Sequence, residues 1–202
     1  MHQARYSLRC APQIIGHCFD MLEFAEKKIL SEATALADNP IILNDGNVWH
    51  GGLFYAIGIA SAADSLTEII YRLSEMLDRQ ILILMDNNLN SGMADNLEIK
   101  EMGHCKGLHQ AISALHQEVK ARSTSSREMS FSCEGNNQDL VPCGMTALNQ
   151  VDKLRETFSE ITRASMFCAL RGVHMSKDSG FPKELHIKNF SDFTIDAREV
   201  LL

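Results

Sequence analysis

The segment FYAIGIASAADSLTEIIYRLSEMLDRQILILM, residues 54–85, decides the fold class of this 202-residue chain. Its apolar side chains recur at intervals of three and four residues, which places them along one side of an α-helix, and no proline interrupts the run. The predicted helix is far longer than the average of about 11–12 residues in globular proteins. A narrow apolar stripe on so long a helix requires partner helices, which predicts a bundle of near-parallel helices.

The same periodicity predicts three further helices. They are expected to run from Pro12 to about Asp38, from His104 to Arg122 and from Cys143 to Val173. Asp45-Gly46, between β-favouring residues, predicts a small hairpin. We therefore predict an all-α fold with one small β-hairpin, in which residues 1–175 form the helical-bundle core and residues 176–202 an irregular C-terminal tail.

The charge composition argues against several partners. The chain has 19 Lys and Arg against 26 Asp and Glu, a formal net charge of -7, and no basic run, so we expect neither nucleic acid nor an anionic membrane surface as a partner. The densest apolar run, ILILM at 81–85, lies between charged residues, which predicts that no segment spans a bilayer. Because the N-terminus also lacks a secretory pattern, we expect a cytoplasmic protein.

The cysteines and histidines do not form a recognisable metal motif. The six cysteines show no CxxC spacing, which is typical of reduced, packed thiols. Cys105 and His109 could share a ligand face of one helix, near His104 and His116, but no acidic partner with a fitting spacing joins them. We therefore expect no metal site.

The N-terminal residues carry candidate chemistry. Gln3, Tyr6 and Arg9 are three residues apart and can line one side of a helical turn. The Arg9 guanidinium offers a planar fork of donors that can bind a carboxylate at two points, and a tyrosine hydroxyl can donate or exchange a proton. The alternative is a solvent-exposed Arg-Tyr pair at the start of a helix.

Two further stretches are unusually rich in glycine or polar side chains. Gly51-Gly52-Leu53-Phe54 lies between the predicted hairpin and the longest helix, where paired glycines let the backbone approach a ligand or simply give a flexible exit from the hairpin. Glu134-Gly135-Asn136-Asn137-Gln138-Asp139 precedes the last helix. Capping of that helix would account for Asp139 alone.

Together these stretches resemble the aromatic amino acid lyase family, which includes histidine, phenylalanine and tyrosine ammonia-lyases and related aminomutases. The matching pieces, in the family's order, are Gln3-x-x-Tyr6-Ser7-x-Arg9-Cys10-x-Pro12-Gln13 with Gly16, Asp38-Asn39-Pro40, Gly51-Gly52-x-Phe54 and Asn137-Gln138-Asp139. The resemblance extends to about Met175 and covers only the C-terminal part of the family's sequence.

The resemblance implies elimination of ammonia from an aromatic amino acid to give an arylacrylate, without metal, nucleotide or pyridoxal phosphate. The family's electrophile is a 4-methylidene-imidazol-5-one formed from an Ala-Ser-Gly segment, and no Ala-Ser-Gly occurs in these 202 residues. By resemblance Tyr6 and Arg9 are catalytic, with Arg9 on the substrate carboxylate. Gln3 and Tyr6 would lie beside the amine and the electrophilic ring, and Phe54 near the reacting carbons.

The resemblance also bears on substrate choice. Gln138 stands where histidine-specific members usually carry a glutamate, and Glu134 with Asn137-Gln138 resembles the phenylalanine- and tyrosine-directed members more closely. We therefore expect these three residues to bind substrate, with a modest preference for phenylalanine or tyrosine over histidine.

Three interpretations remain open at this point. The first is an incomplete ammonia-lyase chain that is inactive alone and assembles as a homo-oligomer, as the family's tetramers do, or with a separate N-terminal lyase half. The second is an aminomutase, which shares the chemistry. The third is a non-catalytic helical scaffold or oligomerisation subunit. A fumarase or aspartase type of enzyme is less favoured, because Ser125-Ser126-Arg127-Glu128-Met129 matches that group's signature loop only faintly.

Overall fold

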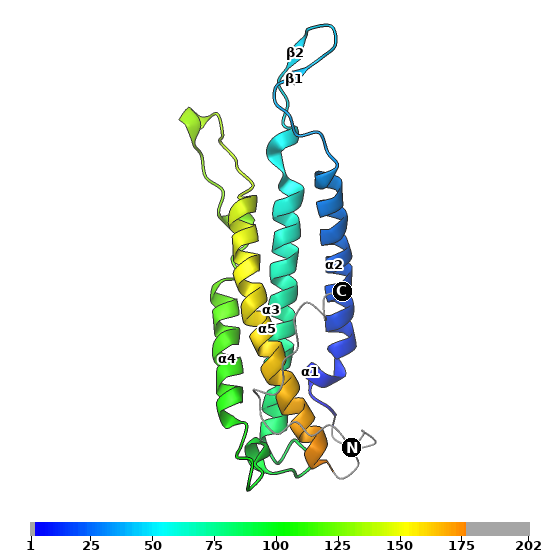
Figure 1. The fold of residues 1–202 in the computed structure, drawn as a ribbon, viewed down its shortest axis with the longest axis vertical. Coiled ribbons are helices and arrows are strands. Elements are labelled where there is room, and N and C mark those ends of the chain that lie inside the picture. The colour runs from blue at the N-terminus through cyan, green and yellow to red at the C-terminus, as the bar shows by residue number, and fades with distance from the viewer. Residues whose placement is uncertain (1–2, 177–202) are drawn as a thin grey trace. The chain divides into compact units, whose positions relative to one another are not determined.

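Helices dominate residues 3–176, the part of the chain that the computed structural model describes (Figure 1). The long helices in this part are α2 (Ala11–Ala33), α3 (Ile57–Met85), α4 (Lys106–Ala121) and α5 (Gly144–Met175). A one-turn helix, α1 (Tyr6–Arg9), precedes α2, and the strands β1 (Ile41–Ile42) and β2 (Val48–Trp49) pair antiparallel. Short 3-10 helices span Leu53–Tyr55, Asp95–Leu97, Ser126–Glu128 and Glu134–Asn136. The predicted all-α fold with one small hairpin is confirmed, whereas the predicted tail lies almost wholly outside the described residues.

The first long helix ends earlier than its apolar pattern predicted. It stops at Ala33, where the Thr34 hydroxyl donates to the carbonyl oxygen of Leu30 at 3.0 Å and so satisfies one of the last helical carbonyls. Leu36, predicted on the apolar seam of this helix, lies beyond its end and is 77% exposed. The prediction for this last turn was wrong, because an apolar residue at helical spacing does not by itself extend a helix.

The longest predicted helix is interrupted near its start. Ala56 has φ 45° and ψ 34°, in the left-handed region, and separates the 3-10 helix Leu53–Tyr55 from α3, which begins at Ile57. A left-handed residue cannot continue a right-handed helix. Phe54 therefore lies on a separate turn and not, as predicted, on the long helix itself.

Contacts between residues divide the chain into two compact units. Within the described part, unit 1 comprises residues 3–15, 70–121 and 155–176, and unit 2 comprises residues 16–69 and 122–154. Three of the long helices contribute residues to both units. Each unit is described here by its own contacts.

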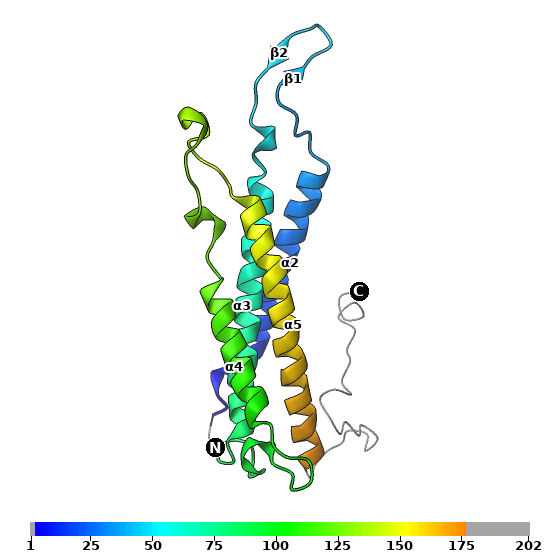
Figure 2. The same ribbon diagram turned by 60° about the vertical axis from the view of Figure 1, so that its left-hand side comes forward.

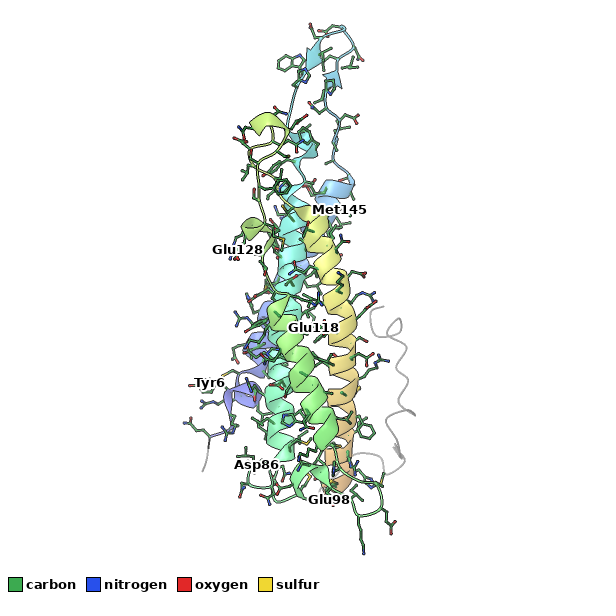
Figure 3. All side chains as sticks on the ribbon, turned by 90° about the vertical axis from the view of Figure 1, so that its left-hand side faces the viewer. Tyr6, Asp86, Glu98, Glu118, Glu128 and Met145 are labelled. Carbon is green, nitrogen blue, oxygen red and sulfur yellow. The ribbon has the colours of Figure 1, made fainter. Side chains whose placement is uncertain are left out.

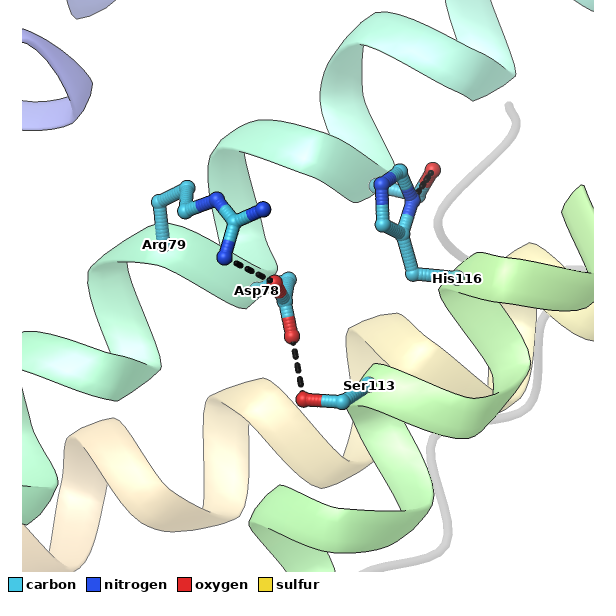
Figure 4. Close-up of polar contacts among 5 residues, drawn as sticks. Asp78, Arg79, Ser113 and His116 are labelled. Carbon is cyan, nitrogen blue, oxygen red and sulfur yellow. Dashed lines mark hydrogen bonds and ion pairs between the residues drawn. The ribbon is translucent and has the colours of Figure 1, made fainter. Parts of the chain in front are cut away.

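Unit 1 buries several polar side chains between its helices, and some of them are paired. Figures 1 and 2 both show α4 beside the C-terminal half of α3. The two helices are joined by the Ser113 hydroxyl, which donates to Asp78 Oδ1 at 2.6 Å, and by Ser74 Oγ, which lies 3.1 Å from His116 Nδ1 (Figure 4). Arg79 Nη1 lies 3.3 Å from Asp78 Oδ2. These pairs stabilise polar groups that would be costly to bury alone.

Unit 2 packs α2 and the start of α5 against the N-terminal half of α3. Gly58 on α3 faces Glu32 on α2, since a Cβ at position 58 would lie 2.7 Å from Glu32 Oε1. Asp64, also on α3, accepts hydrogen bonds from the Ser125 hydroxyl at 2.7 Å, and from the backbone nitrogen and the hydroxyl of Ser126, each at 2.8 Å. Asp64 thereby fixes the start of the segment that leads to the polar stretch at residues 134–139.

Among the described residues, the segment Leu53–Met85 is long and apolar enough to cross a membrane by length and composition. The core helix of a soluble protein passes the same test. This helix carries Asp64 and Asp78, whose carboxylates accept hydrogen bonds from serines of other segments of the chain, as expected of a core helix. The absence of a membrane span stays a prediction.

Candidate active site

The predicted N-terminal cluster is brought together in unit 1. Arg9 Nη1 donates a hydrogen bond to Gln3 Oε1 at 2.6 Å, and the Arg9 guanidinium carbon lies 4.9 Å from the centroid of the Tyr6 ring. The helical turn α1 places Tyr6 and Arg9 on one side, and Gln3 precedes this turn. Gln80 Nε2 donates to the Ser7 carbonyl oxygen at 2.8 Å, which ties α1 to α3.

The three side chains of this cluster are all open to solvent. Tyr6 is 70% exposed and projects outward from α1 in Figure 3. Within residues 3–176, the guanidinium donates to Gln3 and has further N–H donors that suit a carboxylate. The cluster is therefore an exposed cationic surface and not a buried structural pair.

The other predicted site residues line one pocket in unit 2. Its volume is about 1370 Å³, and its walls include Phe54, Glu134, Asn137 and Gln138. Asp38 and Asn39, Gly51 and Asp139 also line it, so three of the four sequence stretches that carry the family resemblance meet at one place. The sequence grouped these stretches only by their resemblance to one family. The structure shows that they line the same pocket.

One wall of the pocket is formed by the two ends of the hairpin. Asn39 Oδ1 accepts a hydrogen bond from the Gly51 backbone nitrogen at 3.1 Å, which links the Asp38-Asn39-Pro40 stretch to the paired glycines. At the tip of the hairpin, Asp45 accepts hydrogen bonds from the backbone and the side chain of Asn47, and these lower the pKa of the Asp45 carboxyl below its usual value. Gly46 supplies the positive φ of 83° that the predicted Asp-Gly turn requires.

The opposite wall is a tight loop with several left-handed residues. Glu134, Gly135 and Asn136 have φ values of 53°, 62° and 69°. An isolated antiparallel bridge between Cys133 and Gln138 closes the loop. Asn137 Nδ2 donates to Glu134 Oε2 at 2.9 Å, so two of the predicted substrate-binding side chains hold each other.

Two residues of this site were missed by sequence reasoning. The Cys133 thiol donates to Gln138 Oε1 at 3.1 Å and so orients the carboxamide. His50 lines the pocket beside Gly51. Cys133 lies five positions before Gln138, and nothing in the sequence distinguishes it from the other packed thiols. The place of His50, next to the paired glycines, was the one signal that could have pointed to it.

The structure brings the predicted site residues together in two groups. Gln3, Tyr6 and Arg9 belong to unit 1, whereas Phe54 and the residues of the polar loop belong to unit 2. Chemically, the first group can bind an anionic head group. The second group offers an aromatic ring, carboxamides and carboxylates, which suit the body of an amphiphilic small molecule.

The comparisons with known proteins identify the family of the chain. A family model described as aromatic amino acid lyase matches residues 1–191. The chain belongs to the aromatic amino acid lyase family. Both groups of site residues fall within the matched part of this lyase-family chain.

Individual relatives differ in their substrates and reactions. The histidine ammonia-lyase of Burkholderia multivorans is 32% identical over 185 residues, which cover 90% of this chain and 36% of that protein. The tyrosine ammonia-lyase of Cereibacter sphaeroides is 32% identical over 183 residues, which cover 88% of this chain and 35% of that protein. The solved structure of a tyrosine aminomutase from Streptomyces globisporus matches with a TM-score of 0.79 and 26% identity, over 87% of this chain and 34% of that chain. The chain thus spans about a third of the length of the relatives that it matches.

Proposed function

We propose that this chain supplies the substrate-holding part of an enzyme that eliminates ammonia from an aromatic amino acid to give an arylacrylate. The observation that carries the proposal is the pocket of unit 2, where three separate family motifs meet around Phe54 and Gln138. The cluster of Gln3, Tyr6 and Arg9 adds a binding surface for a carboxylate.

In this proposal Arg9 binds the α-carboxylate of the substrate through its free donors. Gln3 holds the guanidinium through its carboxamide oxygen, which limits the rotamers that Arg9 can adopt. Tyr6 lies against the same guanidinium, so its hydroxyl has a fixed direction from which to donate to the substrate amine or to exchange a proton. Holding the substrate in one orientation is itself a large part of catalysis.

In the proposed assembly, where a site takes residues from several copies of the chain, Phe54 and Gln138 would contact the rest of the substrate. The exposed ring of Phe54 can pack on the reacting side chain, and the Gln138 carboxamide is uncharged, which suits a phenyl or phenol ring better than an imidazole. Phenylalanine or tyrosine is therefore the proposed substrate. Relatives named for histidine and for tyrosine match equally well, so the preference depends on Gln138 and on its neighbours Glu134 and Asn137.

The family's methylidene-imidazolone supplies an electrophile when it is present in the enzyme. The 202 residues contain no Ala-Ser-Gly tripeptide, so none of them can form this group. The chain's own residues therefore bind and orient the substrate, and we propose that the chain has no activity by itself. The match to a tyrosine aminomutase keeps that reaction as the second candidate, since both reactions begin from the same bound amino acid.

We further propose that the chain assembles in the cytoplasm with copies of itself, as a tetramer, or with a separate N-terminal lyase half. Only Cys18 and Ala25 are buried among the 23 residues of α2. Large apolar side chains on this helix are exposed in unit 2, among them Phe19 (62%), Leu22 (46%) and Leu30 (60%). An apolar helix face of this kind is typical of an interface between subunits.

The test is an assay of arylacrylate absorbance with histidine, phenylalanine and tyrosine. We expect no product from the chain alone, and turnover after it is mixed with or fused to a lyase segment that carries Ala-Ser-Gly. In that assembly Arg9→Ala should lower kcat/KM by about 100-fold, because it removes a hydrogen-bonded ion pair. Arg5→Ala, an exposed arginine outside the cluster, is the matched control and should have little effect. Turnover by the chain alone, or full activity of Arg9→Ala, would contradict the proposal.

Substrate choice has its own test in the same assembly. Gln138→Glu should shift the ratio of kcat/KM values toward histidine by about tenfold, which corresponds to about 1.4 kcal/mol. Asn136→Asp adds the same charge on a residue outside the pocket lining and should leave the ratio unchanged. An unchanged ratio in Gln138→Glu would exclude this residue as the determinant.

A further inference from the structure

Two cysteines of unit 1 form a buried pair that the proposed lyase chemistry does not use. Cys105 immediately precedes α4 and Cys168 lies on α5, and both side chains are 0% exposed. Their thiols are joined by a hydrogen bond. The Cys105 backbone is fixed on both sides, since its nitrogen donates to the Asn96 carbonyl oxygen at 2.8 Å and its carbonyl oxygen accepts from the His109 nitrogen at 3.0 Å.

A buried cation adjoins this thiol pair. Arg171, three residues after Cys168 on α5, is 8% exposed and donates from Nη2 to the carbonyl oxygen of Gly103. Its Nε has no hydrogen-bond partner among the described residues. The guanidinium also hydrogen-bonds to Cys105. A buried arginine requires a negative partner, and a Cys105 thiolate would provide one.

The two thiols differ in their acidity. The hydrogen bond from Cys168, together with the charge of Arg171, lowers the pKa of Cys105 to about 7, although burial acts in the opposite direction. The same hydrogen bond and burial raise the pKa of Cys168. The position of Cys105 at the N-terminus of a 16-residue helix favours its thiolate further. Of the two cysteines, Cys105 is therefore the one that ionises first.

We propose that Cys105 and Cys168 are a site of reversible oxidation by hydrogen peroxide, with Cys105 as the nucleophile and Cys168 as the resolving thiol. The Cys105 thiolate attacks one peroxide oxygen, the O–O bond breaks, and the departing hydroxide takes a proton to become water. Cys105 is then a sulfenic acid. The Cys168 sulfur attacks the sulfenic sulfur, the S–S bond forms as the S–O bond breaks, and the proton of Cys168 leaves with the hydroxide as a second water. Two thiols are oxidised for each peroxide that is reduced to two waters.

Peroxide can reach Cys105 through the segment that precedes it. Residues 100–104 are exposed, and the turn that contains them is closed by the backbone bridge between Ile99 and Gly103 and by the bond from Arg171 to Gly103. Asn96 and Leu97 nearby have positive φ values of 54° and 52°. Opening of this turn would break the Ile99–Gly103 bridge and the Arg171–Gly103 bond, and exposed segments can open locally without global unfolding. The oxidised form would then connect the start of α4 covalently to α5.

This site is independent of the proposed lyase function, and peptide mapping tests it. The full chain is treated with hydrogen peroxide and its remaining thiols are blocked before digestion with trypsin without reductant. The expected product joins the peptide of residues 101–106, EMGHCK, to that of residues 164–171, ASMFCALR, with a mass two hydrogens below their sum. Dithiothreitol should separate the two peptides again. A folded chain that loses its other thiols to peroxide without giving this product overturns the proposal.

Variants assign the roles within the pair. Cys168→Ser should abolish the linked peptide and leave a sulfenic acid at Cys105 that dimedone labels, whereas Cys105→Ser should leave Cys168 unlabelled. Cys18→Ser removes another buried thiol and should not change the rate at which the linked peptide forms.

Arg171→Met should slow this rate about tenfold, and Arg171→Lys, which keeps the charge, should restore most of it. Dimedone labelling of Cys168 in place of Cys105 would reverse the assignment. A rate in Arg171→Met equal to that of the unmodified chain would show that the guanidinium plays no part. If any variant fails to fold, as judged by circular dichroism, the mapping of the unmodified chain decides the proposal.

Discussion

The interior of unit 1 and the pocket of unit 2 place their polar side chains in opposite environments. Among the described residues, the largest fully buried side chains belong almost all to unit 1, and Leu154 of unit 2 is the exception. In unit 1, His116, Ser74 and Asp78 are buried with their partners between helices. In unit 2, the pocket residues Phe54 and Gln138 are exposed and are positioned by turns. The comparison teaches that unit 1 is specified by packing, whereas the candidate site of unit 2 is specified by backbone geometry that leaves its side chains open to a ligand.

We expect the largest loss of stability from a substitution that leaves a cavity in the interior of unit 1. Ile112 on α4 is 0% exposed, so Ile112→Ala should lower the free energy of unfolding by about 2–5 kcal/mol, through lost burial and the cavity left behind. Urea denaturation followed by circular dichroism measures it. Leu140→Ala, at a pocket residue that is 62% exposed, is the control and should cost about 0.5 kcal/mol or less. Equal losses in the two variants would erase the distinction between the units.

A smaller effect is expected from the buried polar pairs. Asp78→Ala leaves the Ser113 hydroxyl without its 2.6 Å acceptor and should lower the free energy of unfolding by about 1–3 kcal/mol. Asp20→Ala, at an exposed position on α2, is the matched control for the loss of one carboxylate. Comparable urea midpoints for the two variants would show that the pairing in unit 1 is not worth more than a surface charge.

The hairpin wall of the pocket should respond more weakly. Asn39→Ala removes the acceptor of the 3.1 Å bond from Gly51, and because both residues are exposed we expect a loss of about 0.5–1 kcal/mol. The more sensitive readout is the chemical shift of the Gly51 amide, which should move toward that of an unbonded amide. Asn47→Ala alters the hairpin tip, away from the pocket lining, and should not move it. If the chemical shift of the Gly51 amide is unchanged in Asn39→Ala, the hydrogen bond between Asn39 and Gly51 does not connect the two motifs.

The smallest effect concerns pH. Burial, the largest cause, lowers the pKa of His116 below its usual value of 6.5. Asp78 and Glu75 act in the opposite direction, and Lys120 and Arg79 act in the same direction as burial. The unfolded chain therefore binds a proton more readily than the folded chain does. Stability should be complete above pH 6.5 and should fall as pH drops from 6.5 through the lower folded-state pKa.

His116→Gln removes this titration and should flatten the dependence of the urea midpoint on pH between about 5 and 7. His17→Gln, at an exposed histidine on α2, is the control and should leave the dependence as it is in the unmodified chain. A steeper loss of stability at low pH in His116→Gln would show that the sign is wrong.

Local patterns in the sequence predicted most elements because they depend on near neighbours. The helices α4 and α5 lie within a few residues of their predicted bounds, and Gly46 forms the predicted hairpin turn. The failures are equally local in origin. Met145, in the last predicted helix, is 70% exposed, because it lies at the first turn of α5, where the helix lines the pocket instead of a core.

The candidate site was predicted as a set of residues and not as a geometry. Their spacing of three residues grouped Gln3, Tyr6 and Arg9 before any geometry was known, and the structure brings the three side chains into contact. It could not show that Cys133 donates to Gln138, because a thiol gives no directional signal in a sequence. The predicted catalytic roles and the substrate stay predictions until the assays described above are made.

The sequence by itself determined the helical elements, the hairpin and the membership of the lyase family, because apolar spacing, turn residues and motif order are all readable along the chain. Only the tertiary structure decided which polar groups are buried and what they contact. His116 and Ser74 are 42 positions apart, and Cys105 and Cys168 are separated still further, yet each pair is in contact. Such contacts depend on how helices pack side by side, and the free energy of that packing is not encoded in any single stretch of residues.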